Sequence, residues 1–384
     1  MKIDRKYLTG ILIGIVLVLV VNLVAKTFFL DDNGMKKLSE IKSIVDKNFT
    51  GEIDDERLKD FMYTGYMAGL NDRYSYYMDK DTFDSFLRDS EGTYVGIGLT
   101  GLFDTDVNKI VVTDIIKNGS AEKVGIKKDD QITAVDGVSL NNSNYNEMFQ
   151  KIRGKEGTTV KLTIFRPSEN KTFEVEATRE NISVPTVESQ FLDDKIGYIK
   201  ISEFDGVTYD QYMTALNDLK NKGMERLIID LRDNPGGLLK TVVQITDTLV
   251  PKGTITYIED KNGNKSYEYS DDDYLNIPLV IMVNGNSASA SEVLSGAVKD
   301  FGVGKLVGEK TFGKGVVQNT FRLSDGSGIK VTIAKYYTPK GICIHGKGIQ
   351  PDYEVKTADA KTSPTSMQDD TQLQKGIEIL KSMK

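Results

Sequence analysis

The spacing of hydrophobic and polar positions changes twice along the chain. Between residues 35 and 90, apolar side chains recur three or four positions apart, which predicts helices. From about residue 93 the chain turns to short β-branched runs separated by Gly and Asp, such as VKLTIFR (160–166). From about residue 190, strands such as RLIIDL (226–231) and LVIMVN (279–284) alternate with helical stretches. This order predicts a helical segment, a β-rich domain and a layered α/β domain.

A separate pattern occurs at the N-terminus, where residues 8–25 read LTGILIGIVLVLVVNLVA. Eighteen helical residues span about 27 Å, close to the thickness of a bilayer core. Basic residues precede this run, so the positive-inside rule places the N-terminus in the cytoplasm and the rest outside it. A cleaved signal peptide is the competing interpretation. The large Leu23, three positions before a cut that would follow Ala25, favours an uncleaved single-pass anchor.

Composition narrows the chemistry. The 384 residues carry a net charge of -7, which disfavours general binding to nucleic acid. The single cysteine, Cys343, excludes an intramolecular disulfide and a cysteine metal cluster. The single histidine, His345, excludes a zinc site built on a pair of histidines. We therefore expect no metal and no cofactor.

Two glycine motifs resemble nucleotide-binding loops. GIGLTG (96–101) matches G-x-G-x-x-G, but a turn and a strand follow it, whereas a dinucleotide site needs a helix there. Such a loop can still hold an anion, including the carboxylate of a peptide C-terminus. GEKTFGKG (308–315) falls one residue short of a Walker A motif, because Gly315 stands where Ser or Thr would bind Mg²⁺.

The segment SASASE (287–292) lies between a buried strand and an apolar helix. Ser289 and Glu292 have the spacing of a capping box, in which the two residues bond reciprocally at the helix start. A serine at this position also lies at the positive end of a helix dipole, where an oxyanion can be stabilised. DLRDNPGG (230–237) follows another strand and predicts a tight turn with exposed N–H groups, and an ordinary turn is the simpler interpretation.

Taken together, these motifs make the chain resemble the carboxyl-terminal processing peptidases, which are tail-specific serine proteases of family S41. The segment from Tyr94 to about Thr178 resembles the PDZ domain of that family. The resemblance covers about residues 35–358, and no single motif is decisive without the others. The motifs occur in order as DLRDNPGG (230–237), NGNSASASE (284–292), GEKTFGKGVVQ (308–318), YYTPKG (336–341) and GKGIQPD (346–352).

The resemblance implies an α/β protease core of the ClpP/crotonase-like class with an inserted β-rich PDZ domain. N-terminal helices and a single N-terminal transmembrane helix complete the expected architecture. The expected boundaries are an anchor at 1–30, a helical segment at 31–92, the PDZ domain at 93–180, the protease core at 181–358, and a linker with a C-terminal helix at 359–384.

The resemblance also implies a catalytic Ser-Lys dyad. Ser289, Lys314 and Gln318 match the family spacing of twenty-five and then four positions, with Gln318 expected to orient the lysine amine. A lysine acts as a base only when neutral, so Lys314 must be buried enough to lower its pKa. The expected oxyanion donors are the N–H groups of Ala290 and Gly236, with Gly237 as the competitor to Gly236. His345 is then interpreted as a turn or surface residue.

The PDZ resemblance implies recognition of a substrate tail. The amides of Ile97, Gly98 and Leu99 would hold its terminal carboxylate, and a pocket would take an apolar last residue. The expected protein is a membrane-anchored serine endopeptidase with its catalytic part outside the cytoplasm. Protein or peptide substrates are its expected partners, with no nucleic acid and with dimerisation through the terminal helices. The alternative is a catalytically silent, PDZ-containing extracytoplasmic scaffold.

Overall fold

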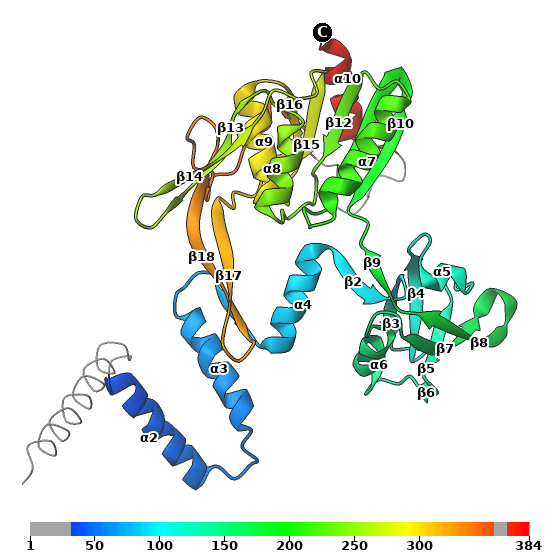
Figure 1. Ribbon diagram of the computed structural model, residues 1–384, viewed down its shortest axis with the longest axis vertical. Coiled ribbons are helices and arrows are strands. Elements are labelled where there is room, and N and C mark those ends of the chain that lie inside the picture. The colour runs from blue at the N-terminus through cyan, green and yellow to red at the C-terminus, as the bar shows by residue number, and fades with distance from the viewer. Residues whose placement is uncertain (1–31, 357–366, 384) are drawn as a thin grey trace, which may run out of the picture. The chain divides into compact units, whose positions relative to one another are not determined.

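The computed structural model describes residues 32–356 and 367–383 (Figure 1). The chain divides into a short N-terminal unit that ends at Gly65 and a large unit that begins at Tyr66. Helix α2 (Asp32–Asn48) lies in the first unit, and α3 (Asp55–Ala68) begins there. The predicted helices are therefore present. Most of their apolar positions are exposed in the described chain, however, with Ile44 57% and Phe61 63% accessible, although Met67 is buried.

The predicted anchor at 8–25 lies outside the described residues. Within the described ranges, no helix combines the length and the apolar character that crossing a bilayer requires.

The β-rich domain is inserted between two short strands. Strand β2 (Thr93–Gly96) pairs antiparallel with β9 (Glu180–Ser183), so the chain enters and leaves the domain side by side. The domain sheet has the order β3-β4-β5-β7-β8, with β6 paired to β5. Its elements are β3 (Leu99–Asp104), β4 (Lys109–Ile115), α5 (Ser120–Lys123), β5 (Gln131–Val135), β6 (Val138–Ser139), α6 (Tyr145–Ile152), β7 (Thr159–Arg166) and β8 (Lys171–Thr178).

QITAVDGVSL (131–140) carries Asp136-Gly137 between two apolar stretches, a pair typical of two-residue turns, and it forms a hairpin. Both residues have positive φ, 48° and 79°, as a two-residue hairpin of type I′ requires, and they join β5 to β6. Side chains from alternate strand positions and from α6, including Ile132, Leu162 and Met148, pack into a core of this domain's own.

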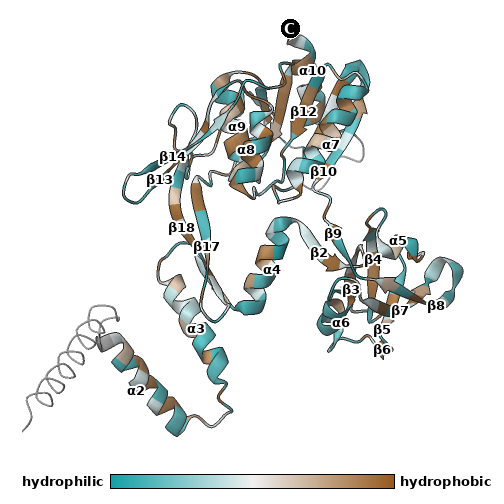
Figure 2. Ribbon diagram, in the orientation of Figure 1, coloured by the Kyte–Doolittle hydropathy of each residue, from teal (hydrophilic) through white to brown (hydrophobic). Residues whose placement is uncertain are grey.

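The α/β core is a sheet of order β10-β11-β12-β15-β16-β19, in which only β10 runs antiparallel to its neighbour. Its strands are β10 (Val187–Leu192), β11 (Ile196–Ile201), β12 (Arg226–Asp230), β15 (Leu279–Val283), β16 (Lys305–Gly308) and β19 (Tyr353–Glu354). Every residue of β15 is buried, as expected for a parallel strand covered on both faces, and Figure 2 shows β12 and β15 as strongly hydrophobic.

Because side chains alternate along a strand, the two faces of this sheet have separate cores. Residues such as Ile229 and Ile281 face helices α7 (Thr208–Asn221), α8 (Leu239–Asp247) and α9 (Ala290–Phe301). Residues such as Ile228 and Val280 face the C-terminal helix α10 (Thr371–Ser382).

The C-terminal helix packs on the sheet of its own chain, and its expected part in assembly stays a prediction. Leu373 and Leu380 pack against the sheet of the same chain and are at most 1% exposed. Arg232, after β12, donates to Asp370 at the helix start from Nη1 at 3.1 Å and from Nη2 at 2.8 Å. The apolar face of α10 thus serves the fold of its own chain.

A second sheet extends the protease core. Its order is β1-β18-β13-β14, with β17 also paired to β18. Helix α4 follows β1 and begins after the cap Asp79, whose side chain accepts from the N–H of Thr82 at 2.8 Å. The elements are β1 (Tyr76–Met78), α4 (Lys80–Glu91), β13 (Gly253–Asp260), β14 (Lys265–Ser270), β17 (Val316–Arg322) and β18 (Gly328–Tyr337).

Candidate active site

Ser289 lies between the carboxyl end of β15 and the first turn of α9. Its backbone adopts φ 54° and ψ −111°, a conformation that non-glycine residues rarely take. Strain of this kind persists only where the surroundings hold it, and it is concentrated at functional sites. The twelve-residue helix α9 directs its positive end at this position, and no hydrogen bond of the described chain uses the N–H of Ala290.

The DLRDNPGG turn lies directly against this serine. A Cβ atom added at Gly236 would come 2.8 Å from the Cβ of Ser289 and 3.0 Å from the N of Ala290, so only glycine fits there. The turn is tied to the serine loop through the carbonyl of Asn234, which accepts from the Ala288 N–H at 3.0 Å and from the Ser291 hydroxyl at 3.0 Å.

Gly236 and Gly237 differ in whether their backbone N–H groups are already hydrogen-bonded. The Gly236 N–H donates to the Asn234 side-chain oxygen at 2.8 Å, whereas the described chain offers no hydrogen-bond partner to the Gly237 N–H. Gly237 and Ala290 therefore carry the N–H groups that are open to an oxyanion in this conformation. The assignment of Gly236 as a donor stays a prediction, and it requires the bond to Asn234 to be exchanged when substrate binds.

Glu292 has a larger role than the cap that the sequence predicts. Its fully buried carboxylate accepts from the Ser289 N–H at 3.0 Å, as in a capping box. It also accepts from the Thr311 hydroxyl at 2.6 Å and from the N–H groups of Gly313 at 2.7 Å and Lys314 at 2.8 Å. Burial raises the pKa of Glu292, although these four donors favour the charged form. One carboxylate thus joins the backbone of Ser289 to the backbone of Lys314.

Tyr336, on β18, joins the same two residues through their carbonyl groups. Its hydroxyl donates to the Ser289 carbonyl at 2.8 Å and also contacts the Lys314 carbonyl. Burial raises the pKa of Tyr336 far above its ordinary value, so this hydroxyl keeps its proton. The residue belongs to the YYTPKG motif, but its spacing alone gave no indication of this contact.

Lys314 is half-buried, and its electrostatic surroundings disfavour its charge. Burial lowers its pKa, and the positive charges of Lys330 and Arg73 lower it further. Asp72 and Glu292 have smaller opposing effects. The amine lies 4.8 Å from the centre of the Tyr74 ring and forms no hydrogen bond with Ser289 in this conformation. Catalytic hydrogen bonds are often long in proteins without substrate and shorten when it binds.

Gln318 lies on β17 in the same cleft, but it does not contact the lysine amine. Its amide donates weakly to the Val316 carbonyl at 3.3 Å and to the Thr332 hydroxyl at 3.4 Å. Its expected role in orienting Lys314 stays a prediction, which requires a change of side-chain conformation.

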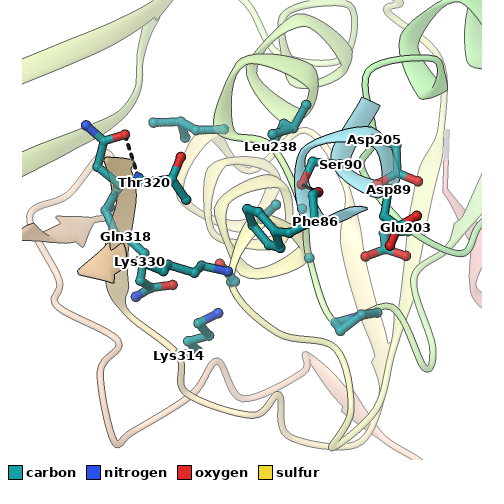
Figure 3. Close-up of a pocket in the computed structure, with 18 of the residues that line it drawn as sticks. Phe86, Asp89, Ser90, Glu203, Asp205, Leu238, Lys314, Gln318, Thr320 and Lys330 are labelled. Carbon is teal, nitrogen blue, oxygen red and sulfur yellow. Dashed lines mark hydrogen bonds between the residues drawn. The ribbon is translucent and has the colours of Figure 1, made fainter. Parts of the chain in front are cut away.

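A single cleft of about 600 Å³ collects these groups (Figure 3). Ser289, Lys314 and Gln318 line it, together with Lys330 and with an acidic group on the opposite side. Neither Lys330 nor the acidic residues belong to a catalytic motif, so no pattern in the sequence indicated them. The lining residues with predicted roles are Gly236, Gly237, Ser289, Ala290, Lys314 and Gln318.

His345 lies outside this cleft. It is exposed, and its backbone packs beside Gly315, where an added Cβ would come 2.5 Å from the His345 nitrogen. The interpretation of His345 as a turn or surface residue is therefore confirmed. Within residues 32–356 and 367–383, no group of His, Cys, Asp and Glu side chains could hold a metal ion.

The second predicted site is the loop between β2 and β3. Gly98 has φ 79°, and the carbonyls of Ile97 and Gly98 accept from the N–H groups of Ala121 at 2.7 Å and Ile116 at 2.9 Å. The described chain uses neither the Ile97 N–H nor the Gly98 N–H in a hydrogen bond. Leu99 begins β3, which lies at the end of its sheet and so leaves one edge unpaired.

Comparison with known proteins agrees with this geometry. Residues 195–355 match peptidase family S41, and residues 85–165 match the PDZ domain. A probable CtpA-like serine protease of Staphylococcus aureus (strain COL) is 36% identical over 369 residues, which cover 92% of this chain and 73% of that protein. The chain belongs to peptidase family S41.

Other relatives support the same assignment. The carboxy-terminal processing protease CtpB of Bacillus subtilis (strain 168) is 36% identical over 334 residues, covering 85% of this chain and 69% of that protein. The solved structure of a photosystem II D1 C-terminal processing protease is 28% identical, with a TM-score of 0.50 over 88% of this chain and 90% of that chain. This S41 chain is thus a serine protease of the carboxyl-terminal processing class, and it carries a PDZ domain.

Proposed function

We propose that this S41 protease cleaves peptide bonds with Ser289 as nucleophile and Lys314 as general base. The observation that carries the proposal is the double link between the two residues. Glu292 binds the N–H groups of both, and the Tyr336 hydroxyl reaches the carbonyls of both. Among the described residues, no titratable side chain other than Glu292 and Tyr336 bonds to the Ser289 backbone.

The reaction follows from these positions. Neutral Lys314 removes the proton from the Ser289 hydroxyl while the oxygen attacks the scissile carbonyl carbon. The N–H of Ala290, with one from the Gly236-Gly237 turn, stabilises the resulting oxyanion. Protonated Lys314 then gives its proton to the leaving amine as the carbon–nitrogen bond breaks. In the second half, Lys314 removes a proton from water, and the attack of that water releases the acid product and restores Ser289.

This mechanism requires one local rearrangement. The amine of Lys314 must leave the face of the Tyr74 ring and approach the Ser289 hydroxyl. Burial lowers the pKa of Lys314, and the positive neighbours Lys330 and Arg73 lower it further, so the amine is neutral at a lower pH than that of an isolated lysine.

The test compares the wild type with Ser289→Ala and Lys314→Met on a peptide that has an apolar C-terminus. Both variants should lose at least about 10³-fold in kcat/KM, while the exposed Lys335→Met control retains activity. The kcat/KM of the wild type should rise with pH as Lys314 loses its proton. Turnover by Ser289→Ala equal to that of the wild type would refute the assignment, and a wild type that binds peptides without cleaving them would favour a scaffold.

We further propose that the PDZ domain binds the C-terminal tail of the substrate. The free amides of Ile97 and Gly98 suit a carboxylate, and the unpaired edge of β3 suits an added peptide strand. Fluorescence anisotropy should give a much weaker Kd for a peptide with an amidated C-terminus than for the same peptide with a free carboxylate. Equal affinities would discard the carboxylate contact.

The cellular setting is also a proposal. Residues 8–25 would anchor the protein in the membrane with its catalytic part outside the cytoplasm, where it meets protein substrates. We expect the full chain to resist alkaline extraction from membranes, and we expect protease added outside intact cells to digest its catalytic part.

Dimerisation is tested by sedimentation of the purified protein. A monomer at all concentrations would contradict it.

A further inference from the structure

Three carboxylates gather in the cleft on the side away from Lys314. Asp89 comes from α4, and Glu203 and Asp205 come from the segment between β11 and α7 (Figure 3). The described chain supplies none of the three with an ion pair, and the charges that act on Asp205 are those of the other two. The cleft thus has a basic side at Lys314 and Lys330 and an acidic side.

The backbone fixes this acidic group relative to the oxyanion turn. The N–H of Phe204 donates to the Gly236 carbonyl at 2.8 Å, and its carbonyl accepts from the Leu238 N–H at 2.7 Å. Phe204 itself is fully buried in the core. Because side chains alternate along extended backbone, Glu203 and Asp205 project from the opposite side of this segment, into the cleft.

Asp205 is the unusual member of the group. It is only 7% exposed, yet its carboxylate accepts no hydrogen bond from the described chain. Its backbone instead bonds to Thr208 and Thr241, at 2.9 and 3.0 Å. The carboxylate oxygens reach the cleft and are not fully enclosed, and a largely buried charge of this kind is normally paired. Burial, followed by the charges of Glu203 and Asp89, raises the pKa of Asp205 to about 7.

We propose that Asp89, Glu203 and Asp205 form a subsite that binds a lysine or arginine side chain of the substrate. The proposal rests on the proposed peptidase function and adds a specificity to it. The segment that carries Asp205 lies one strand spacing, about 4.8 Å, from the glycine turn beside Ser289. An extended substrate advances about 3.3 Å per residue, so this spacing places the basic side chain about one or two residues from the scissile bond.

An organic cation suits this site better than a metal ion. The described carboxylates do not converge into a set that could hold a metal. Asp89 and Glu203 are exposed at the rim, whereas Asp205 lies deeper. A long side chain with a charged end can pass the rim and deliver its charge to Asp205, where it gains charge-assisted hydrogen bonds.

The experiment measures kcat/KM for peptides that place lysine or its neutral isostere norleucine at each position within four residues of the scissile bond. At one position the wild type should prefer lysine by on the order of tenfold. The Asp205→Asn and Glu203→Gln variants should reduce this ratio toward one. Glu188→Gln, which alters an exposed carboxylate on β10, is the matched control and should keep the wild-type ratio.

A binding measurement separates this proposal from the peptidase function. The Ser289→Ala protein should bind the lysine peptide more tightly than the norleucine peptide. If the wild type cleaves peptides with no lysine preference at any position, the subsite is refuted and the peptidase function stands. The same holds if the preference persists in the protein that carries both Asp205→Asn and Glu203→Gln. If Ser289→Ala shows the binding preference and the wild type cleaves no peptide, the subsite stands and the peptidase function is refuted.

Discussion

Replacing Glu292 with glutamine tests whether this carboxylate holds the catalytic pair together. The change preserves shape but replaces one acceptor oxygen with an NH₂ group. Each oxygen of Glu292 accepts two bonds, one from Thr311 and Gly313 and the other from Lys314 and Ser289. Whichever way the amide turns, two donors of the native site lose their acceptor and face another donor.

The magnitude follows from the number of donors left without a partner. Each buried polar group that loses its hydrogen bond costs about 1–3 kcal/mol, so two cost about 2–6 kcal/mol. The loss of a buried charge offsets part of this free-energy cost, because a neutral amide is less costly to desolvate than a carboxylate. We expect a net loss of about 2–4 kcal/mol in the free energy of unfolding. A typical domain has about 5–15 kcal/mol, so the variant should still fold.

The assay combines urea denaturation with steady-state kinetics under conditions where the protein is folded. Glu292→Gln should lower kcat strongly with a smaller change in KM, because Ser289 and Lys314 lose their common anchor. Thr311→Val is the matched control. It removes one donor to Glu292 and the acceptor of the Ile349 N–H, so it should destabilise by about 1–3 kcal/mol but reduce kcat less, because the backbone bonds of Glu292 to Ser289 and Lys314 remain. A Glu292→Gln protein with the stability and kcat of the wild type would refute the reasoning.

Other predictions use single positions around the same cleft. Lys330→Met removes a positive neighbour of Lys314, so the pKa of Lys314 should rise. The ascending limb of the pH profile of kcat/KM should then move to higher pH, and an unmoved limb would contradict the electrostatic coupling of Lys330 to Lys314. Asp205 has a folded-state pKa raised to about 7, so the wild type should lose stability as pH rises from about 4 to 7. Asp205→Asn should remove this loss, which screening in the open cleft limits to about 1–2 kcal/mol, and urea denaturation at pH 5 and pH 8 measures it. Gly236→Ala should abolish activity because its Cβ would clash with the serine loop, whereas Gly285→Ala, with nothing within 4 Å, should remain active in the same peptide assay.

Much of the architecture could be predicted because local patterns decide it. The alternation of strands and helices after residue 190 corresponds to the sheet and helices of the protease core. The Asp136-Gly137 pair corresponds to a hairpin, and Ser289 lies at a strand-to-helix turn as expected. These features depend on short-range backbone preferences and on periodicity, both of which are visible in a single sequence.

The acidic group could not be predicted because its members meet only in the folded chain. Asp89 lies more than a hundred positions before Asp205, with the whole PDZ domain between them. The C-terminal helix shows the same limit in another way. Its apolar face was visible in the sequence, but the surface that covers it, which includes Ile228 and Val280 of the same chain, was not.

The five ordered sequence motifs now have a common physical explanation, because each contributes to one hydrogen-bond network around Glu292. The DLRDNPGG turn binds the serine loop, and the loop at 308–315 supplies three of the four donors to the carboxylate. The Thr311 hydroxyl also accepts from the Ile349 N–H at 2.7 Å, so the last motif supports the donor that binds Glu292. Tyr336 closes the network from β18. Docking of the lysine loop and capping of the serine helix therefore share one acceptor group, so damage to either should disturb both catalytic residues. The contributing motifs are DLRDNPGG (230–237), NGNSASASE (284–292), GEKTFGKGVVQ (308–318), YYTPKG (336–341) and GKGIQPD (346–352).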